Sequence, residues 1–231
     1  MGTKQVNISS NLQEPTARPY NPITLSSNRS TILSKIYQDN VNMTVWRRKL
    51  KQGVLLAAEH VLRDHPNLKT SQVVSPTNAV QLVRHNIDDS EIVVHLAYDI
   101  CRLIKEFCDL FKVNETHLRL TALEETMCPR FHVDRLACRL LTTYRGKATE
   151  WLQHEHVDRS KLGLGNQGKP DNESGLFNSS SDIRKLLTGD VAIMKGENWL
   201  GNEGRGLVHR SPHLENSANR LLLTLDFISK K

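Results

Sequence analysis

The chain has 231 residues and a formal net charge of +6, with 38% hydrophobic and 24% charged residues. This balance is ordinary for a globular protein with a sizeable core, and no apolar run is long enough to cross a bilayer. The basic residues are scattered, and the densest run, WRRKLK at 46–51, holds one aromatic residue. A solvated basic face is therefore favoured over a nucleic-acid surface. The first residues, MGTKQVNISSNLQEP, lack the apolar core of a secretory signal and predict a cytoplasmic protein.

The N-terminal part of the chain is predicted to be helical with little sheet. Residues 1–30 are rich in Ser, Asn, Thr and Pro, which predicts an extended or poorly ordered arm. Apolar and polar residues alternate within 36–46, as in a strand, and helical spacing follows at 52–62 and 75–84. The strongest helical stripe spans 90–113, with Ser90 as N-cap. A helix this apolar needs a large surface to pack against, and a sheet is the expected partner.

From residue 116 onward the hydrophobic period changes to that of strands. Strand-like segments occur at 116–125, 130–134, 137–146, 148–152, 189–196, 206–211 and 219–228. Strands gathered after helices indicate an α+β protein rather than alternating βαβ units. Residues 154–181 form a long polar insertion, which is typical of a lid, a binding loop or a disordered segment.

Four residues in three of these segments suggest a metal centre. His132 and Asp134 form an HxD pair, and His209 follows in a later segment. Two imidazoles and one carboxylate form the facial triad that holds Fe(II) while leaving positions open. Arg220 begins the last segment and offers a planar, charged fork for the far end of a dicarboxylate cosubstrate. Thr224 shares the Arg220 face of a strand and could donate a hydroxyl to the same carboxylate.

The order HxD…H…R within short strands resembles the 2-oxoglutarate/Fe(II)-dependent dioxygenase superfamily over residues 116–231. This resemblance implies a double-stranded β-helix (jelly-roll) core and the hydroxylation of a small-molecule or peptide substrate. It also implies that Fe(II) is held by His132, Asp134 and His209, with no catalytic residue beyond these ligands. Arg220 would bind 2-oxoglutarate, with Tyr144 or Thr142 as a further contact.

The resemblance implies a division of the chain into an N-terminal arm (1–30), a helical buttress with room for one strand (31–115) and a metal-binding β core (116–231). Residues 31–231 would form one folded unit. Neither a nucleic acid nor a membrane is expected as a partner.

A second resemblance leaves the metal open. The strings CPRFHVDR, YRGKATEWL and KGENWLGNEGRGLVHRSP are similar to a bacterial family of domains of unknown function that is associated with zinc-limitation gene clusters. The alternative is therefore a zinc-binding or metal-homeostasis protein that uses the same His/Asp set without oxygenase activity, with Cys128 as an alternative ligand. A third alternative is a binding module of jelly-roll fold whose histidines lie in the core and bind no metal.

The approach to His209 is longer and more polar than the superfamily pattern. It places polar and aromatic residues beside the expected metal, where they would recognise a substrate or mark a remodelled site: Glu197, Trp199, Asn202, Glu203 and Arg205. Trp151 and Trp199 are open to two interpretations, since indole rings either pack in a core or form the wall of a ligand pocket.

Overall fold

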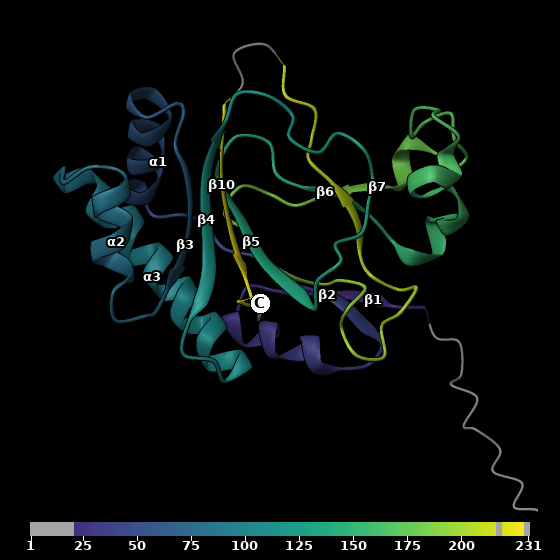
Figure 1. The fold of residues 1–231 in the computed structure, drawn as a ribbon, viewed down its shortest axis with the longest axis horizontal. Helices are drawn as coiled ribbons and strands as arrows, with labels where there is room; N and C mark the ends of the chain where they lie inside the picture. The colour runs from purple at the N-terminus through teal and green to yellow at the C-terminus, as the bar shows by residue number, and fades with distance from the viewer. Residues whose placement is uncertain (1–20, 216–218, 229–231) are drawn as a thin grey trace, which may run out of the picture.

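Two β-sheets form the framework of the computed structural model, which describes residues 21–215 and 219–228 (Figure 1). The major sheet has seven strands in the order β1-β2-β8-β5-β10-β4-β3, and the minor sheet has three in the order β7-β6-β9. The major sheet consists of β1 (Ile23–Ser27), β2 (Val41–Trp46), β3 (Lys69–Val74), β4 (Thr116–Leu123), β5 (Cys138–Arg145), β8 (Val191–Lys195) and β10 (Arg220–Asp226). The minor sheet consists of β6 (Glu150–Leu152), β7 (Ile183–Lys185) and β9 (Val208–Arg210).

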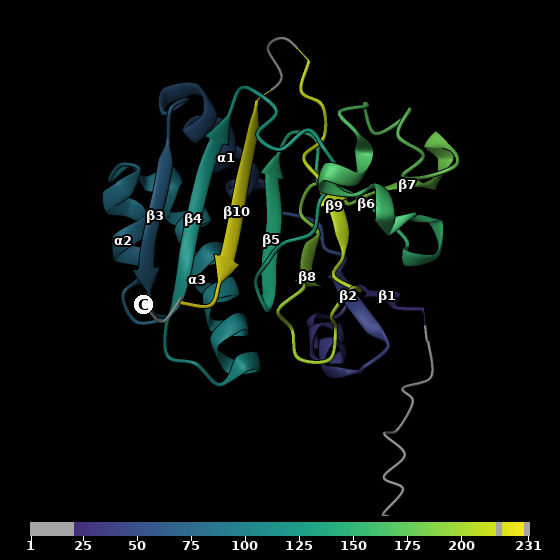
Figure 2. The same cartoon turned by 45° about the vertical axis from the view of Figure 1, so that its right-hand side comes forward.

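Helices cover one face of the major sheet, called the outer face below (Figures 1 and 2). They are the 3-10 helix η1 (Ser30–Tyr37) and the α-helices α1 (Gln52–Asp64), α2 (Ala79–Asn86) and α3 (Glu91–Phe111). The apolar stripe of α3, which includes Leu96 and Ile100, is fully buried against the strands in one large core. The helix ends where Lys112 adopts a left-handed conformation with φ of 55°.

The helices and strands agree with an α+β protein, as the sequence predicts. The expected helix at 90–113 is α3, and the expected helix at 52–62 is α1, two residues longer. The helix expected at 75–84 is shifted to 79–86 because residues 75–78 form a turn, in which the Asn78 side chain accepts a hydrogen bond from the Ser75 amide at 2.9 Å. None of the described helices is long and apolar enough to span a membrane.

The N-terminal part contributes more sheet than the sequence indicates. Three of the seven major strands, β1, β2 and β3, precede residue 116, and β2 pairs directly with β8. The structure therefore does not separate a helical buttress at 31–115 from a β core at 116–231. Of the arm expected at 1–30, residues 1–20 lie outside the described residues, whereas 23–27 form β1.

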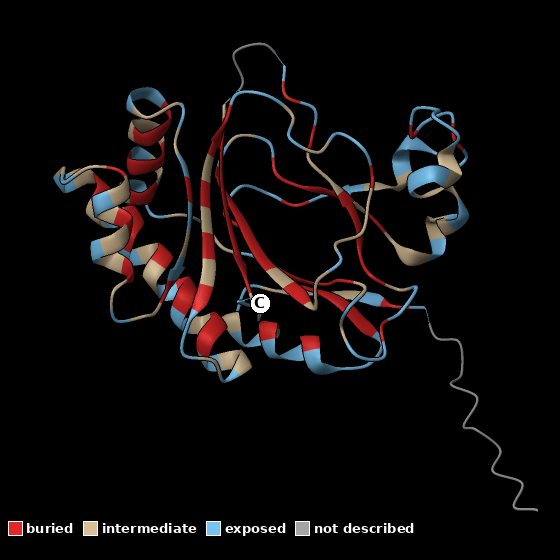
Figure 3. Cartoon of the chain, viewed as in Figure 1, coloured by how far each residue is buried: buried red, intermediate tan, exposed pale blue. Residues whose placement is uncertain are grey.

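The insertion at 154–181 packs on the minor sheet instead of projecting as a long loop. It contains the short 3-10 turns η2 (His154–His156), η3 (Arg159–Lys161) and η4 (Gly163–Asn166), and η5 (Ser180–Asp182) begins at its end. Leu176 and Phe177 from the insertion join Phe131, Leu152 and Val208 in an apolar cluster. Figure 3 shows that its turns expose much of their surface, while the major strands are mostly buried. The insertion therefore covers the side of the minor sheet on which Leu152 and Val208 lie.

Candidate metal centre

The two histidines and the aspartate that the sequence singled out lie together. His132 forms an isolated bridge with His209 in β9, and each backbone N–H donates to the other's carbonyl at 3.0 Å. The strand expected at 130–134 is thus reduced to this one bridge. Asp134 follows it, and one potential ligand atom from each of the three side chains lies within 4.8 Å of the others.

Backbone carbonyls orient both imidazole rings toward the shared space. His132 Nδ1 lies 2.9 Å from the carbonyl of Arg130, and His209 Nδ1 lies 3.1 Å from the carbonyl of Leu207. A carbonyl only accepts, so each Nδ1 carries the proton and each Nε2 presents a lone pair. The Nε2 atoms lie 3.9 Å (His132) and 3.6 Å (His209) from oxygens of Asp134. These separations exceed a hydrogen bond and suit groups that face a common cation.

Burial and hydrogen bonding prepare His209 and Asp134 for a cation. Burial lowers the pKa of His209 to about 4, although Asp134 opposes this shift, so the imidazole is neutral near pH 7. Asp134 accepts a hydrogen bond from Arg139 Nη1 at 2.7 Å. Arg139 also binds Asp226 at the end of β10, through Nε at 2.8 Å and Nη2 at 3.0 Å. A chain of ionic contacts thus fixes the ligand carboxylate to the major sheet.

Arg220 lies between the two sheets as a buried cation. It is 1% exposed, and its guanidinium donates to hydroxyl groups: Thr143 in β5 at 3.1 Å, Thr149 just before β6 at 2.8 Å and Ser211 just after β9 at 3.4 Å. No carboxylate of the described residues lies within 4 Å of it. Burial without a counterion lowers the pKa of Arg220 to about 10. A bound anion would supply the missing charge.

Strand parity places Arg220 on the face of the major sheet opposite the helices, called the inner face. Leu221, Leu223 and Leu225 of β10 pack in the core with the helices, so the alternate residues Arg220 and Thr224 point the other way. Thr224 is buried on this face. The sequence did not single out the hydroxyl neighbours Thr143 and Thr149, and the strand CRLLTTYR has apolar residues at both parities, so it does not separate Thr143 from Thr142.

The expected cosubstrate contacts from Tyr144 and Thr142 are wrong, because both residues lie on the outer face. Thr142 is paired with Leu223, whose side chain belongs to the helix-facing core. Tyr144 is fully buried in that core, and its hydroxyl donates to Asp99 of α3 at 2.9 Å. Since the sheet separates them from Arg220, neither side chain reaches a ligand held there.

The two tryptophans lie in different places. Trp151 of β6 is paired with His209 and packs on the inner-face residues Leu141 and Met194, so it stands beside the metal centre. Trp199 instead packs on Tyr37 and Phe111, with ring centroids 5.7 and 6.3 Å away, next to the helical core. Trp151 therefore borders the His-Asp-His cluster, whereas Trp199 packs against the aromatic rings of the helical side.

The remaining rim candidates hold their own loop together. Glu197 accepts from Arg159 at 2.5 Å and from the Gly204 amide at 2.7 Å. Asn202 is buried and donates to the Gly196 carbonyl at 3.1 Å. Glu203 accepts from the Gly201 amide at 3.3 Å, and Arg205 donates to the Gly201 carbonyl. Through these contacts the four side chains stabilise the loop before β9.

Cys128 does not join the cluster. Within residues 21–215 and 219–228, the group that could hold a metal at this place contains only His132, Asp134 and His209. The backbone of Cys128 is nearby, since its carbonyl accepts from the Ser211 amide at 3.0 Å, and its thiol is free. The geometry thus disfavours a closed Cys/His zinc site.

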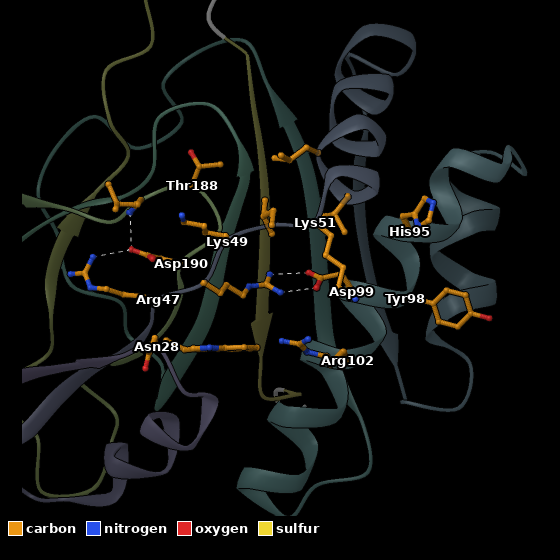
Figure 4. Close-up of a pocket in the computed structure, with 16 residues that line it drawn as sticks. Asn28, Arg47, Lys49, Lys51, His95, Tyr98, Asp99, Arg102, Thr188 and Asp190 are labelled. Atoms are coloured by element: carbon orange, nitrogen blue, oxygen red, sulfur yellow. Dashed lines mark hydrogen bonds and ion pairs between the residues drawn. The ribbon is translucent and has the colours of Figure 1, made fainter.

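A cavity of about 1180 Å³ lies away from this centre, between β2, the segment that follows it, and α3 (Figure 4). The basic run 46–51 forms part of its wall, so this run borders a hollow rather than a flat face. Arg48 pairs with Asp99 at 2.6 Å, and the guanidinium of Arg102 lies 4.6 Å from the Trp46 ring. No residue of the metal centre lines the cavity.

Comparison with solved structures identifies proteins of similar fold. A dioxygenase for auxin oxidation from rice matches with a TM-score of 0.51 and 10% identity, over 91% of this chain and 84% of that one. Its Arabidopsis thaliana counterpart, in a 2-oxoglutarate binary complex, matches with a TM-score of 0.46 and 13% identity, over 91% and 93%. A Pseudomonas putida prolyl-4-hydroxylase matches with a TM-score of 0.44 and 12% identity, over 87% and 94%. At such identities, the match to the rice protein shows a shared fold and nothing more.

Sequence comparison assigns the family. No curated protein matches the chain. The model of the family described as "Protein of unknown function (DUF1826)" matches residues 27–226, which include all of β2–β10, the last residue of β1 and all four members of the His-Asp-His-Arg set. The chain therefore belongs to the DUF1826 family.

Proposed function

We propose that the protein is a non-haem Fe(II)- and 2-oxoglutarate-dependent oxygenase that hydroxylates a small molecule or a peptide. The observation that carries the proposal is Arg220, a buried guanidinium without a carboxylate partner among the described residues. The hydroxyls that it contacts belong to both sheets, and one of them, on Ser211, lies two residues from His209. A dicarboxylate bound between the two groups would coordinate the metal at one end and balance the charge of the guanidinium at the other.

The residues present fit the two cofactors. His132, Asp134 and His209 would hold Fe(II) through two nitrogens and one oxygen, with their other atoms fixed by carbonyls and Arg139. When bound, iron and 2-oxoglutarate supply the oxidation of a C–H bond by O₂. Arg220 orients the far carboxylate of the cosubstrate through its fork, with Thr224 as a further donor. Trp151 excludes water beside His209.

We infer that the inner face of the major sheet and the minor sheet form a double-stranded β-helix. The metal ligands lie where β9 and the His132 bridge meet, and Arg220 joins the two sheets. The rice protein of similar fold is named a dioxygenase, which agrees with this assignment.

The first test is spectroscopic. Anaerobic protein loaded with Fe(II) is expected to develop a weak visible charge-transfer band when 2-oxoglutarate is added. Arg220→Ala should weaken 2-oxoglutarate binding by about 30-fold or more, because truncating one partner of a buried charge pair costs about 2–5 kcal/mol. His209→Ala should abolish the band by removing a ligand.

Arg145→Ala is the matched control. Arg145 lies in the same sheet, but its side chain is 53% exposed and pairs with Glu59. This variant should develop the band at the same concentration of 2-oxoglutarate as the wild type. Absence of the band in wild-type protein, together with zinc that survives chelator washes, would replace the oxygenase by a zinc-binding protein built on the same three residues.

A further inference from the structure

A second group of histidine and carboxylate side chains lies where α1 meets α3. His60 lies near the end of α1, His65 is the C-cap of that helix, and Asp88 precedes Ser90, the N-cap of α3. One potential ligand atom each from His60, His65 and Asp88 lies within 4.8 Å of the others. The sequence does not reveal this set, because its members come from two helix ends that only the fold brings together.

The carboxylate of Asp88 is aimed between the two rings. Its Oδ2 atom lies 2.8 Å from His60 Nε2 and 2.7 Å from His65 Nε2. Its Oδ1 atom accepts from the Ser90 amide at 2.8 Å and from the Ser90 hydroxyl. Because Ser90 fixes one oxygen, the other is held toward both imidazoles.

Counting protons shows that a neutral His60 cannot donate to both of its carboxylate neighbours. His60 Nδ1 lies 2.7 Å from Asp64 Oδ2, while its Nε2 lies 2.8 Å from Asp88 Oδ2. A neutral imidazole has one N–H, so it can donate to only one of these oxygens. If Nδ1 donates to Asp64, the Nε2 lone pair faces a carboxylate oxygen. A cation between these two atoms, either a proton or a metal ion, resolves the conflict.

We propose that His60, His65 and Asp88 bind a divalent transition metal of the zinc class, with Asp64 orienting His60. A metal-bound histidine that donates its other N–H to a carboxylate is a recurrent arrangement, and His60 with Asp64 has it. Zinc takes imidazole nitrogens and carboxylate oxygens at about 2.0–2.2 Å, which separates tetrahedral ligand atoms by about 3.3–3.5 Å. The atoms now 2.7–2.8 Å apart need to part by only about 0.6 Å.

Access and local charge also suit a cation. The three side chains are 19%, 31% and 27% exposed, so an ion can enter from solvent and a water molecule can complete the shell. The negative end of the α1 dipole lies at His60 and His65 and favours a cation there. The neighbouring Arg63 donates to Asp64 at 2.8 and 2.9 Å, and its Nη2 also lies 3.2 Å from His60 Nδ1, on the side of the ring that faces away from Asp88.

A metal at this place would tie the end of α1 to the start of α3. Both helices pack on the outer face of the major sheet, so the site is separate from the centre on its inner face. Its role is therefore to clamp the helical layer, and binding should raise the melting temperature.

The test uses Co²⁺ and Zn²⁺ alone on the full chain. In a His132→Ala/His209→Ala background, Co²⁺ titration should give visible d–d absorption that saturates at one equivalent, and dialysed protein should retain one zinc. Adding His65→Gln should remove both signals and the zinc-dependent rise in Tm. His85→Gln, an exposed histidine of α2, is the matched control and should leave all three unchanged.

Two measurements guard against misfolding. Far-UV circular dichroism and Tm without metal should match between the background and its His65→Gln variant, since glutamine can still donate to Asp88. In the otherwise wild-type chain, His65→Gln should lower the zinc stoichiometry by one. Less than one equivalent of Co²⁺ in the background protein, or equal binding after His65→Gln, would overturn the proposal. The background lacks the first centre, so the result does not depend on the oxygenase assignment.

Discussion

The folded chain buries the positive charge of Arg220, and no carboxylate among the described residues balances it. Desolvating an unpaired cation is unfavourable, so the free protein is less stable than it would be with an apolar side chain of similar volume. We expect Arg220→Met to have a Tm at or above that of the wild type when no ligand is added. Addition of 2-oxoglutarate with Fe(II) should raise the Tm of the wild type only, as measured by differential scanning fluorimetry.

The control for this experiment is Arg145→Met, which should respond to 2-oxoglutarate like the wild type because Arg145 is half exposed. A marked drop in the Tm of the ligand-free Arg220→Met protein would mean that the hydroxyl contacts of Arg220 stabilise the fold more than its burial destabilises it.

Asp190 gives a pH-dependent prediction. It is 3% exposed, accepts from the Leu187 amide at 2.9 Å and lies 3.6 Å from Arg47. Burial raises the pKa of Asp190 above its usual range. The folded protein then binds this proton more tightly than the unfolded chain does. The loss of folding stability from burying the ionised carboxylate is absent below the unfolded pKa of about 3.9 and fully present above the folded pKa.

Asp190→Asn is therefore expected to raise the Tm at pH 7, with an advantage that shrinks as the pH falls toward 4. Thermal unfolding of both proteins across this range checks the sign. An advantage that grows toward low pH would show that the Arg47 contact outweighs the burial of Asp190.

At the scale of single residues, the sequence singled out the three side chains that cluster in the fold, but not the groups around Arg220. His132, Asp134, His209 and Arg220 could be chosen because their chemistry and order are unusual. Thr143 and Thr142 are neighbours of the same type, and only the pairing of β5 with β10 decides which one faces Arg220. The register of that pairing shifts between Leu221 and Leu222, and no sequence pattern predicts this irregularity.

Among the elements, the turn after β5 controls the position of β10. Gly146 has a φ of +89°, and a Cβ atom there would lie 2.4 Å from the Asn219 carbonyl oxygen and 3.0 Å from the Arg220 Cα. We expect Gly146→Ala to destabilise the protein by more than about 1 kcal/mol, because the φ is strained and the start of β10 has to move. Binding of 2-oxoglutarate should weaken as well, which calorimetry of the Fe(II)-loaded protein would detect.

Gly163→Ala distinguishes the effect of a strained φ from the effect of displacing β10. Gly163 also has a positive φ, of +55°, but a Cβ atom there would meet nothing within 4 Å. This variant should lose some stability and keep 2-oxoglutarate affinity. Equal losses of affinity in both variants would exclude a specific link between Gly146 and Arg220.

The long periodic elements were predictable, and the short or polar strands were not. The stripe of α3 extends over many turns, so its period is unambiguous. β3 has the sequence KTSQVV and lies at the edge of the major sheet, where one side of the strand has no neighbour, so its composition is polar. The segment 130–134 has strand-like residues but makes only the His132–His209 bridge, since Asp134 turns back to meet the histidines.

For the molecule as a whole, the major sheet separates two environments. Its outer face packs on helices and carries the His60–His65–Asp88 set at their joint, while its inner face carries Arg220 and faces the centre at His132. The cavity of Figure 4 lies on the helical side, bordered by α3. A ligand in that cavity therefore cannot touch an ion held by His132, Asp134 and His209.

The position of β10 has a consequence for synthesis on the ribosome. This strand comes last in the described chain, yet it lies inside the sheet between β4 and β5. Until residues 220–226 emerge, β4 and β5 have no common neighbour and expose unpaired backbone edges. Until then the nascent chain can bind chaperones or form incorrect strand pairs. The same strand also carries Arg220 to its site. Completion of the fold and completion of the proposed cosubstrate site are then a single event.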